Sequence, residues 1–324
     1  MKAAVIYRQG DLPHYTDMPD PVAQNEDELL LTVTAAALKH VDKGRAAGRH
    51  YSADTPPAGS GHIPGGDGVG RLSDGRRVYG IGVTGMLAEK ALIDRRRIVP
   101  VPDGLDDATA AALPNAVIGA AMGLRFKAGL QPGDVVLVNG ATGFTGRVAV
   151  QLAKYYGAAK VIVTGRNSDS LEALRQLGAD AVVPVTPDDD AFGTQLSALH
   201  AERPIDVVID YLWGRTAEII LACLKGNGRF TNRVRYVSVG SVTGDAIQLS
   251  AANLRSVDLQ LSGSGLGAWS REQVGLLFSE ILPEAFGLTA QGRLQVETVQ
   301  LPLAEIDRLW HMAVPAGQRL VVRI

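Results

Sequence analysis

Hydrophobic positions in the middle of the chain form short runs that do not alternate with polar residues. Such runs, rich in β-branched residues, are typical of strands buried on both faces. They lie at 135–138, 161–164, 181–183, 207–210 and 236–239, and a sixth is predicted at 259–262. Stretches with apolar residues at helical spacing lie between some of them, at 146–156, 169–177 and 216–224. This alternation predicts an α/β fold with a doubly wound parallel sheet.

The first third of the chain has a different pattern of short strands and turns. Runs at 3–7 and 28–34 are strand-like, and glycines crowd between Arg45 and Gly85. This is typical of a small, strongly curved β unit. A helix predicted at 271–285 and a final strand at 320–324 have no partner of their own, so we expect them to return to that unit. The predicted boundaries are 1–112 and 265–324 for the β unit, and 113–264 for the parallel sheet.

Composition and charge exclude several classes of function. The 324 residues include 32 Lys and Arg against 34 Asp and Glu, a net charge of −2. The basic surplus that binds nucleic acid or an anionic membrane is therefore missing. No stretch is apolar over the ~18 residues that a membrane span needs. The single cysteine, Cys223, cannot form an internal disulfide and no leader-like pattern opens the chain, so we expect a cytoplasmic location.

A glycine-rich turn follows the first buried strand and leads directly into a helix. Its glycines stand three apart, so backbone amides at the helix start can approach a pyrophosphate that no Cβ blocks. The alternative is a glycine-rich turn without a ligand, but the position between strand and helix favours dinucleotide binding. The predicted contacts in this turn are Thr142, Gly143, Phe144, Thr145 and Gly146.

The end of the second buried strand distinguishes between two dinucleotides. An acidic residue there would bind the ribose 2′-OH of NAD. The chain instead has Gly165, Arg166 and Asn167 at this point, with no acid. Gly165 makes room, and the Arg166 guanidinium is a bidentate donor for a 2′-phosphate. We therefore expect NADPH as the cofactor, the alternative for Arg166 being a solvated loop charge.

Several segments, in their order and spacing, resemble a known family. They are 1–5, 37–48, 63–70, 75–78, 130–138 and 177–180. Together they are similar to the zinc-independent quinone oxidoreductases of the medium-chain dehydrogenase/reductase superfamily. The resemblance implies a GroES-like β-rich catalytic domain around an inserted Rossmann domain, and a homodimer formed through the edge of the Rossmann sheet. Tyr156 and Lys160 have the spacing of the catalytic Tyr-x-x-x-Lys pair of short-chain dehydrogenases. In that family the pair lies on a much later helix, so we do not assign it a catalytic role here.

The same resemblance indicates that zinc is absent. Zinc-using members bind the catalytic metal with two cysteines and a histidine, and the matching positions here are Lys39, Gly66 and Asn115. These residue types cannot form a three-ligand zinc site. The chemistry implied is hydride transfer from NADPH to a quinone or an α,β-unsaturated carbonyl compound. The alternatives are an NADPH-binding sensor or structural protein with little turnover, and an alcohol dehydrogenase.

Candidate catalytic residues come from the same comparison. Lys39 stands where quinone reductases usually have asparagine, and it could bind a developing oxyanion, extend to solvent, or pair with Asp42 or Asp67. Asp42 matches a family aspartate that would orient Lys39 or cap the following helix. Tyr51 lies in the region of a family tyrosine near the substrate, or is an ordinary surface tyrosine.

The nicotinamide end of the cofactor is expected near three further residues, Gly240, Ser241 and Ser264, which follow the fifth and sixth strands. Before the fifth strand, residues 230–235 look like an insertion relative to the family. The loops expected to select the substrate, 48–62 and 264–271, carry no readable pattern.

Overall fold

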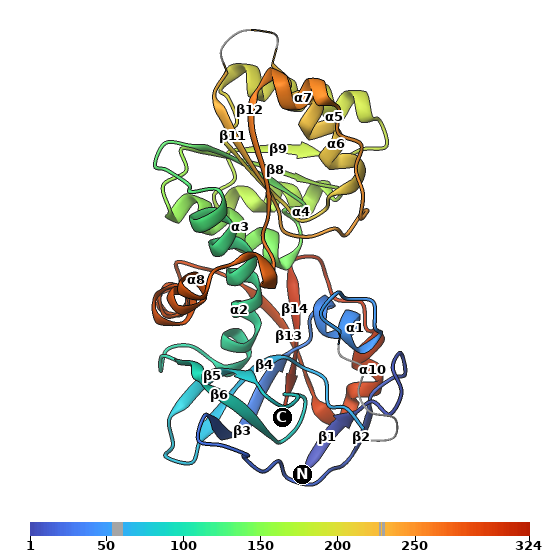
Figure 1. Cartoon of the computed structure of the whole chain (residues 1–324), viewed down its shortest axis with the longest axis vertical. Helices are drawn as coiled ribbons and strands as arrows, with labels where there is room; N and C mark the ends of the chain where they lie inside the picture. Colours follow the sequence, from blue (N-terminus) through green and yellow to red (C-terminus); the bar gives the residue numbers. More distant parts are fainter. Residues whose placement is uncertain (54–60, 227, 229–230) are drawn as a thin grey trace. The chain divides into compact units, whose positions relative to one another are not determined.

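The computed structural model describes residues 1–53, 61–226, 228 and 231–324. Its contacts divide the chain into two compact units (Figure 1). The β-rich unit comprises Met1–Pro114 and Phe278–Ile324, and the parallel-sheet unit comprises Asn115–Leu277. The boundaries proposed from sequence, after 112 and after 264, differ from these because helix α2 (Asp107–Met122) and helix α8 (Arg271–Leu276) lie at the two junctions.

Six strands form the sheet of the parallel-sheet unit, in the order β12-β11-β10-β7-β8-β9. Every neighbouring pair is parallel. This is the doubly wound order, in which a ligand crevice lies at the carboxyl ends of the strands where the order reverses, here between β7 and β10. The strands are β7 (Val135–Asn139), β8 (Lys160–Gly165), β9 (Ala181–Pro184), β10 (Val207–Asp210), β11 (Arg233–Ser238) and β12 (Asp258–Gly263).

Helices connect these strands. The predicted helices 146–156 and 216–224 are present with shifted ends, whereas 169–177 is α-helical only to Glu172 and continues as a 3-10 helix. The sequence pattern did not predict helix α5, because its polar first turn obscures the spacing of the apolar residues Phe192 and Leu196. The Asp188 side chain caps this helix by accepting hydrogen bonds from the amides of Asp190 and Ala191, at 3.1 and 3.0 Å. It packs beside α6. The helices are η1 (Gly123–Lys127), α3 (Phe144–Tyr155), α4 (Ser168–Glu172), η2 (Ala173–Leu177), α5 (Asp189–Glu202), α6 (Gly214–Cys223), α7 (Ala251–Ser256) and η3 (Leu266–Ala268).

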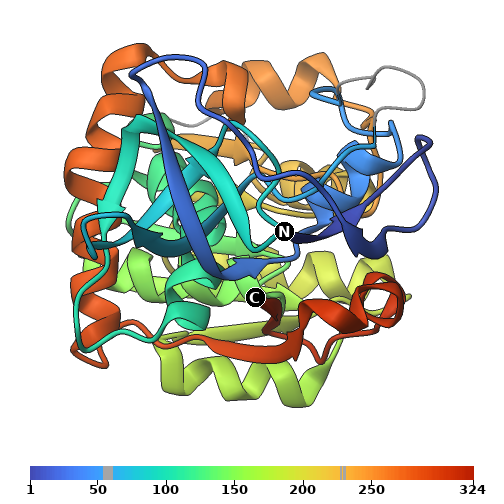
Figure 2. The same ribbon diagram turned by 90° about the horizontal axis from the view of Figure 1, so that it is seen from below.

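The β-rich unit contains a closed circuit of strands (Figure 2). β3 pairs antiparallel with both β4 and β6, and β5 pairs with the same two strands, so the four form a small barrel. β14 pairs with β3, which brings the C-terminal segment back to this unit. The strands are β1 (Lys2–Val5), β2 (His14–Asp17), β3 (Glu28–Ala37), β4 (Asp67–Leu72), β5 (Arg77–Gly82), β6 (Lys90–Pro100), β13 (Glu297–Pro302) and β14 (Gln318–Arg323).

The helix predicted at 271–285 is wrong as a single regular element. After α8, a π-helical turn, η4 (Leu277–Ile281), precedes α9 (Leu282–Ala290). Pro283, in the first turn of α9, has no amide to donate, and this favours a break in the regular ladder. The other helices of the unit are α1 (His40–Ala46), η5 (Leu303–Glu305) and α10 (Ile306–His311). The sequence pattern missed β13 and α10.

Candidate active site

The glycine turn after β7 has the geometry that a pyrophosphate requires. Gly140 has φ of +85°, and a Cβ there would lie 2.8 Å from Leu212. A Cβ on Gly146 would lie 2.6 Å from the Ala141 Cα, so neither position accepts a side chain. Gly143 is different, because its Cβ would meet only the Gly140 carbonyl oxygen, at 3.9 Å. The space in front of Gly143 is therefore open.

Helix α3 begins at this open position. Its N-cap is Gly143, so no side chain caps the first turn, formed by Phe144, Thr145 and Gly146. Amides at a helix start and the positive end of the helix dipole together favour an anion. The turn predicted from sequence thus forms the cradle expected for a phosphate group of a dinucleotide.

The end of β8 lies against the same turn. A Cβ on Gly165 would stand 2.6 Å from the Thr142 Cγ2, so these two predicted residues are neighbours. Arg166 and Asn167 follow on the exposed side. The Asn167 side chain accepts a hydrogen bond from the Ser170 amide at 2.8 Å and so caps α4. The site provides an exposed guanidinium and contains no acid at the strand end, a combination that suits a 2′-phosphate.

Asp210, at the end of β10, joins three strands and was missed by the sequence analysis. It accepts hydrogen bonds from the Asn139 side chain at 2.7 Å, from the Leu212 amide at 2.8 Å and from the Tyr236 hydroxyl at 2.7 Å. Burial, with Asp210 adding, raises the pKa of Tyr236 well above its ordinary value. A buried strand ending in aspartate beside one ending in asparagine was the available signal. This network fixes the carboxyl edge between β7 and β10.

Tyr211 follows Asp210 and has an unmet hydrogen-bonding group. Its hydroxyl is buried without a hydrogen-bond partner among the described residues, and burial raises its pKa. A Cβ on Gly119 would contact Thr145, Val239 and the Tyr211 ring, so these groups converge at one place. Because Thr145 belongs to the glycine turn, the Tyr211 ring lies at the dinucleotide edge. An orphaned buried hydroxyl there fits a site that a ligand completes.

The residues expected at the nicotinamide end lie after β11 and β12. A Cβ on Gly240 would stand 2.8 Å from the Tyr211 carbonyl oxygen, so only glycine fits. Ser241 is exposed. Ser264 is buried; its amide donates to the Ser238 carbonyl at 2.8 Å, and its hydroxyl lies 3.3 Å from the Trp269 indole nitrogen.

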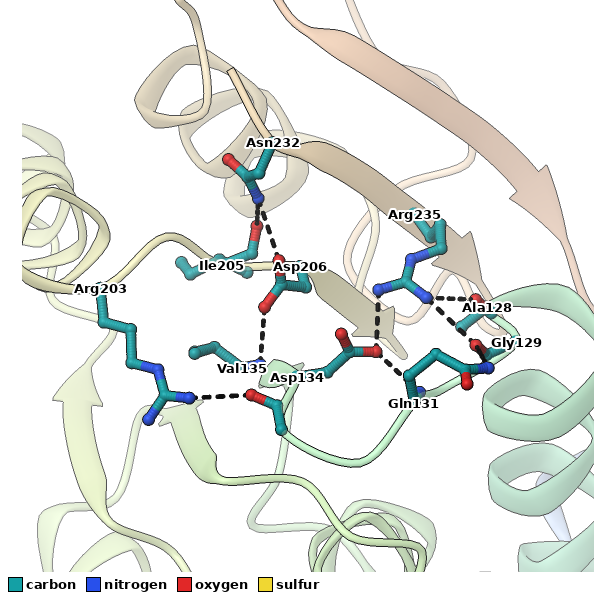
Figure 3. Close-up of polar contacts among 11 residues, drawn as sticks. Ala128, Gly129, Gln131, Asp134, Val135, Arg203, Ile205, Asp206, Asn232 and Arg235 are labelled. Atoms are coloured by element: carbon teal, nitrogen blue, oxygen red, sulfur yellow. Dashed lines mark hydrogen bonds and ion pairs between the residues drawn. The ribbon is translucent and has the colours of Figure 1, made fainter. Parts of the chain in front are cut away.

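Strand β11 begins earlier than the predicted 236–239, because part of the segment interpreted as an insertion, 230–235, belongs to it. Phe230 lies outside the described residues, whereas Arg233–Arg235 open strand β11 and pair with β12. Figure 3 shows the Asn232 side chain donating hydrogen bonds to the Ile205 carbonyl and to Asp206. The Arg235 guanidinium donates to Asp134 and to the carbonyls of Ala128 and Gly129. These contacts join the amino ends of the strands, the edge opposite the glycine turn.

In the β-rich unit, Lys39 sits at the start of α1 with its side chain buried. Its ammonium forms an ion pair with Asp67 and lies 3.4 Å from Asp42 Oδ2. The Tyr79 hydroxyl donates to the other Asp67 oxygen at 2.7 Å. Burial lowers the pKa of Lys39, but Asp42 and Asp67 outweigh burial and raise it above its ordinary value. Of the alternatives left open by sequence, Lys39 pairs with both aspartates and does not extend to solvent.

Asp42 both caps α1 and orients Lys39. Its Oδ2 accepts from the Lys39 amide at 2.9 Å, and its Oδ1 from the Gly66 amide at 3.3 Å. Arg319, from β14, is also buried nearby; burial lowers its pKa to about 10, against the opposing effect of Asp42 and Asp67. The negative charges of Asp42 and Asp67 are therefore balanced by the positive charges of Lys39 and Arg319 in one cluster.

Tyr51 is a surface residue that follows helix α1. It is 76% exposed and stacks on His50, with ring centroids 4.3 Å apart. His50 and Arg45 both contact the Ser52 hydroxyl, each at 2.8 Å.

These residues do not fit a zinc ion. The Lys39 ammonium is ion-paired and has no lone pair, and Gly66 has no side chain. The Arg45 Nη1 lies 3.4 Å from where a Cβ on Gly66 would stand, which brings a cation to that position. Among the described residues, no group of three or more His, Cys, Asp or Glu could hold a metal ion. In the same part of the chain, no helix is long and apolar enough to cross a bilayer.

A doubly wound parallel sheet with this glycine turn, together with a β-rich unit split along the chain, defines the two-domain class of dinucleotide-dependent dehydrogenases. The family model described as zinc-binding dehydrogenase matches residues 145–280. This match and the relatives below confirm the expected resemblance to the quinone oxidoreductases of the medium-chain dehydrogenase/reductase superfamily.

Individual relatives agree with this placement. Over 96% of both chains, the protein is 28% identical to a probable NADPH-dependent quinone reductase of Emericella nidulans. It is 35% identical to the NADPH-dependent alkenal/one oxidoreductase of Arabidopsis thaliana, over 51% of this chain and 46% of that one. The quinone oxidoreductase of Thermus thermophilus, solved also in complex with NADPH, superposes with a TM-score of 0.81 at 28% identity over 100% of both chains.

Proposed function

We propose that this chain is an NADPH-dependent, zinc-independent oxidoreductase that reduces quinones or α,β-unsaturated carbonyl compounds. The observation that carries the proposal is the open glycine turn at Gly143 followed by a strand end that has arginine and no acid. The similarity to the fungal quinone reductase and the plant alkenal/one oxidoreductase supports the same reaction class.

The residues that would hold NADPH fall into three groups at one sheet edge. The glycine turn would bind the pyrophosphate, and Gly165, Arg166 and Asn167 would bind the adenosine 2′-phosphate. Gly240, Ser241 and Ser264 would contact the nicotinamide end. When bound, NADPH supplies the hydride.

The β-rich unit would stabilise charge that develops on the acceptor. As hydride arrives, the carbonyl oxygen gains negative charge, and a preorganised cation lowers the energy of that state. Lys39 has three N–H donors and is held in place by Asp42 and Asp67, so no reorganisation is needed. Asp42 would act as a positioning residue, and Tyr51 would donate its hydroxyl to the substrate.

The test is NADPH oxidation with 9,10-phenanthrenequinone, benzoquinone and a short alkenal. Turnover with any of them, and tighter binding of NADPH than of NADH, is the expected result. Binding of NADPH with no turnover on all three would instead favour a sensor or structural role. NADP⁺-dependent oxidation of a simple alcohol, without reduction of these acceptors, would favour an alcohol dehydrogenase.

We also propose a cytoplasmic homodimer formed through strand β12. This strand pairs with β11 alone among the described strands, and an unpaired edge can extend into the sheet of a second copy. Around it, Leu254, Leu261 and Leu266 are 49%, 39% and 53% exposed. Light scattering on the purified protein is expected to give twice the chain mass, and Leu261→Lys is expected to shift it to the monomer.

A further inference from the structure

A pocket of about 180 Å³ lies within the β-rich unit. Helix α1 supplies Asp42 and Arg45 to its wall, and two glycine-rich turns supply Gly65, Gly66, Thr84 and Gly85. It adjoins the Lys39 cluster, because Asp42 belongs to both.

The Arg45 guanidinium is held rigidly from one side. Its Nε donates to the Ser52 hydroxyl at 2.8 Å, and that oxygen lies 2.8 Å from His50 Nδ1. The Ser52 amide donates to the same Nδ1 at 3.2 Å, so this nitrogen is an acceptor and His50 is neutral. Burial first, and Arg45 second, lower the pKa of His50, in agreement with that assignment.

The other side of the guanidinium is unused. Its Nη1 lies 3.4 Å from the position that a Cβ on Gly66 would take. Within the described part of the chain, neither Nη of Arg45 has a hydrogen-bond or ion-pair partner. The planar group thus directs free N–H donors to the pocket wall formed by the glycines.

Arg45 also has no ion-pair partner among the described residues, although Asp42 Oδ1 lies 3.9 Å from the same Cβ position on Gly66. Asp42 lines the same pocket, but Asp42 and Asp67 are already balanced by Lys39 and Arg319. A fixed guanidinium with open Nη donors matches a carboxylate, which it can bind through two parallel hydrogen bonds.

We infer that Arg45 makes this pocket a carboxylate subsite, and that the preferred acceptors are enones or quinones that carry a carboxylate group. The inference rests on the proposed function for the reducible part of the substrate. It adds a substrate class that the names of the relatives do not contain.

The test compares trans-6-oxo-4-heptenoate with its methyl ester. Two methylene groups separate the carboxyl group from the enone, so the two compounds have the same reducible group and differ in charge. The wild type is expected to have the higher kcat/KM for the acid. Losing a charge-assisted bidentate contact in Arg45→Gln should reduce kcat/KM for the acid by about tenfold or more, mainly through KM, and bring the acid-to-ester ratio toward one. Arg45→Lys keeps the positive charge but cannot form two parallel hydrogen bonds, so its kcat/KM for the acid should lie between those of the wild type and Arg45→Gln.

Arg49→Gln is the matched control, since Arg49 is exposed just after helix α1 and does not line the pocket. It should leave the ratio unchanged. Calorimetry with 4-oxopentanoate, which cannot be reduced at an alkene, gives a readout independent of NADPH, and Arg45→Gln should abolish its binding. Equal use of acid and ester by the wild type, or a ratio unaffected by Arg45→Gln, would overturn the subsite while leaving the reductase function intact. Binding of 4-oxopentanoate through Arg45 without reduction of either enone would support the subsite and reject the function.

Discussion

Lys39 and Asp67 form an ion pair with both side chains buried, 28 residues apart in the chain. The Tyr79 hydroxyl completes the carboxylate by donating to its second oxygen at 2.7 Å. A buried ammonium is tolerated only with such partners, because its desolvation is costly. The burial of Lys39 therefore depends on Asp67 of β4 and Tyr79 of β5.

Removing one partner should destabilise the protein strongly. Asp67→Asn leaves Lys39 with a single carboxylate nearby, and breaking a buried pair costs about 3–5 kcal/mol. Urea unfolding followed by circular dichroism measures the change. The control, Asp74→Asn, breaks an exposed pair with Arg76 and should leave the midpoint where it was. Equal midpoints for both variants would show that the Lys39 pair adds no stability.

Replacing the ammonium should affect turnover more than cofactor binding. Lys39→Met removes the charge that we place near the developing oxyanion, so kcat for quinone or enone reduction should fall by about tenfold to a thousandfold. The Kd of NADPH, measured by fluorescence, should stay the same. Lys43→Met, on the same helix, serves as control. An unchanged kcat in Lys39→Met would remove this residue from the mechanism.

Two buried tyrosines should respond in opposite ways to loss of the hydroxyl. Tyr211→Phe deletes a donor that has no partner in the described residues, so it should raise the stability of the cofactor-free protein by about 1 kcal/mol and weaken NADPH binding severalfold. Tyr236→Phe breaks the bond to Asp210 and should lower stability by about 1–3 kcal/mol. Thermal unfolding with and without NADPH distinguishes them. Unaltered NADPH affinity in Tyr211→Phe would contradict the assignment at the dinucleotide edge.

Arg166 should determine the choice of dinucleotide. Arg166→Ala is expected to raise the Kd of NADPH about tenfold to a hundredfold, because a charge-assisted contact to the 2′-phosphate is lost. The Kd of NADH should change little, and Arg175→Ala, an exposed arginine paired with Glu172, should change neither. An equal loss of affinity for NADPH and NADH in Arg166→Ala would show that Arg166 does not contact the 2′-phosphate.

Stability should decrease on mild acidification. Burial lowers the pKa of His40, His50 and His200 below 6.5. The unfolded chain then binds more protons than the folded one in this range, so the free energy of unfolding is highest above pH 6.5 and falls as pH drops through the lowered pKa values. Urea titrations from pH 8 to pH 5 measure this slope. His200→Gln, which loses the group that accepts from the Ile205 amide, should flatten it. A wild-type stability that rises on acidification would be inconsistent with the lowered pKa values of these histidines.

The sequence alone determined the parallel sheet, the glycine turn and the absence of an acid after β8. These features follow from local patterns: β-branched runs without alternation, glycines at fixed spacing, and the residue type at a strand end. The return of the last strand could also be predicted, because the final segment lacks a partner in its own neighbourhood. Short-range chemistry is sufficient for each of these.

Only the tertiary structure decided which partner Lys39 takes, where β11 begins, and which buried groups remain unsatisfied. Lys39 pairs with Asp67 as well as Asp42 because β4 brings a residue distant in sequence beside the start of α1. Arg235 looks like part of a loop until β11 places it against Asp134. Burial and long-range pairing depend on how strands from separate parts of the chain come together, and no local pattern encodes that.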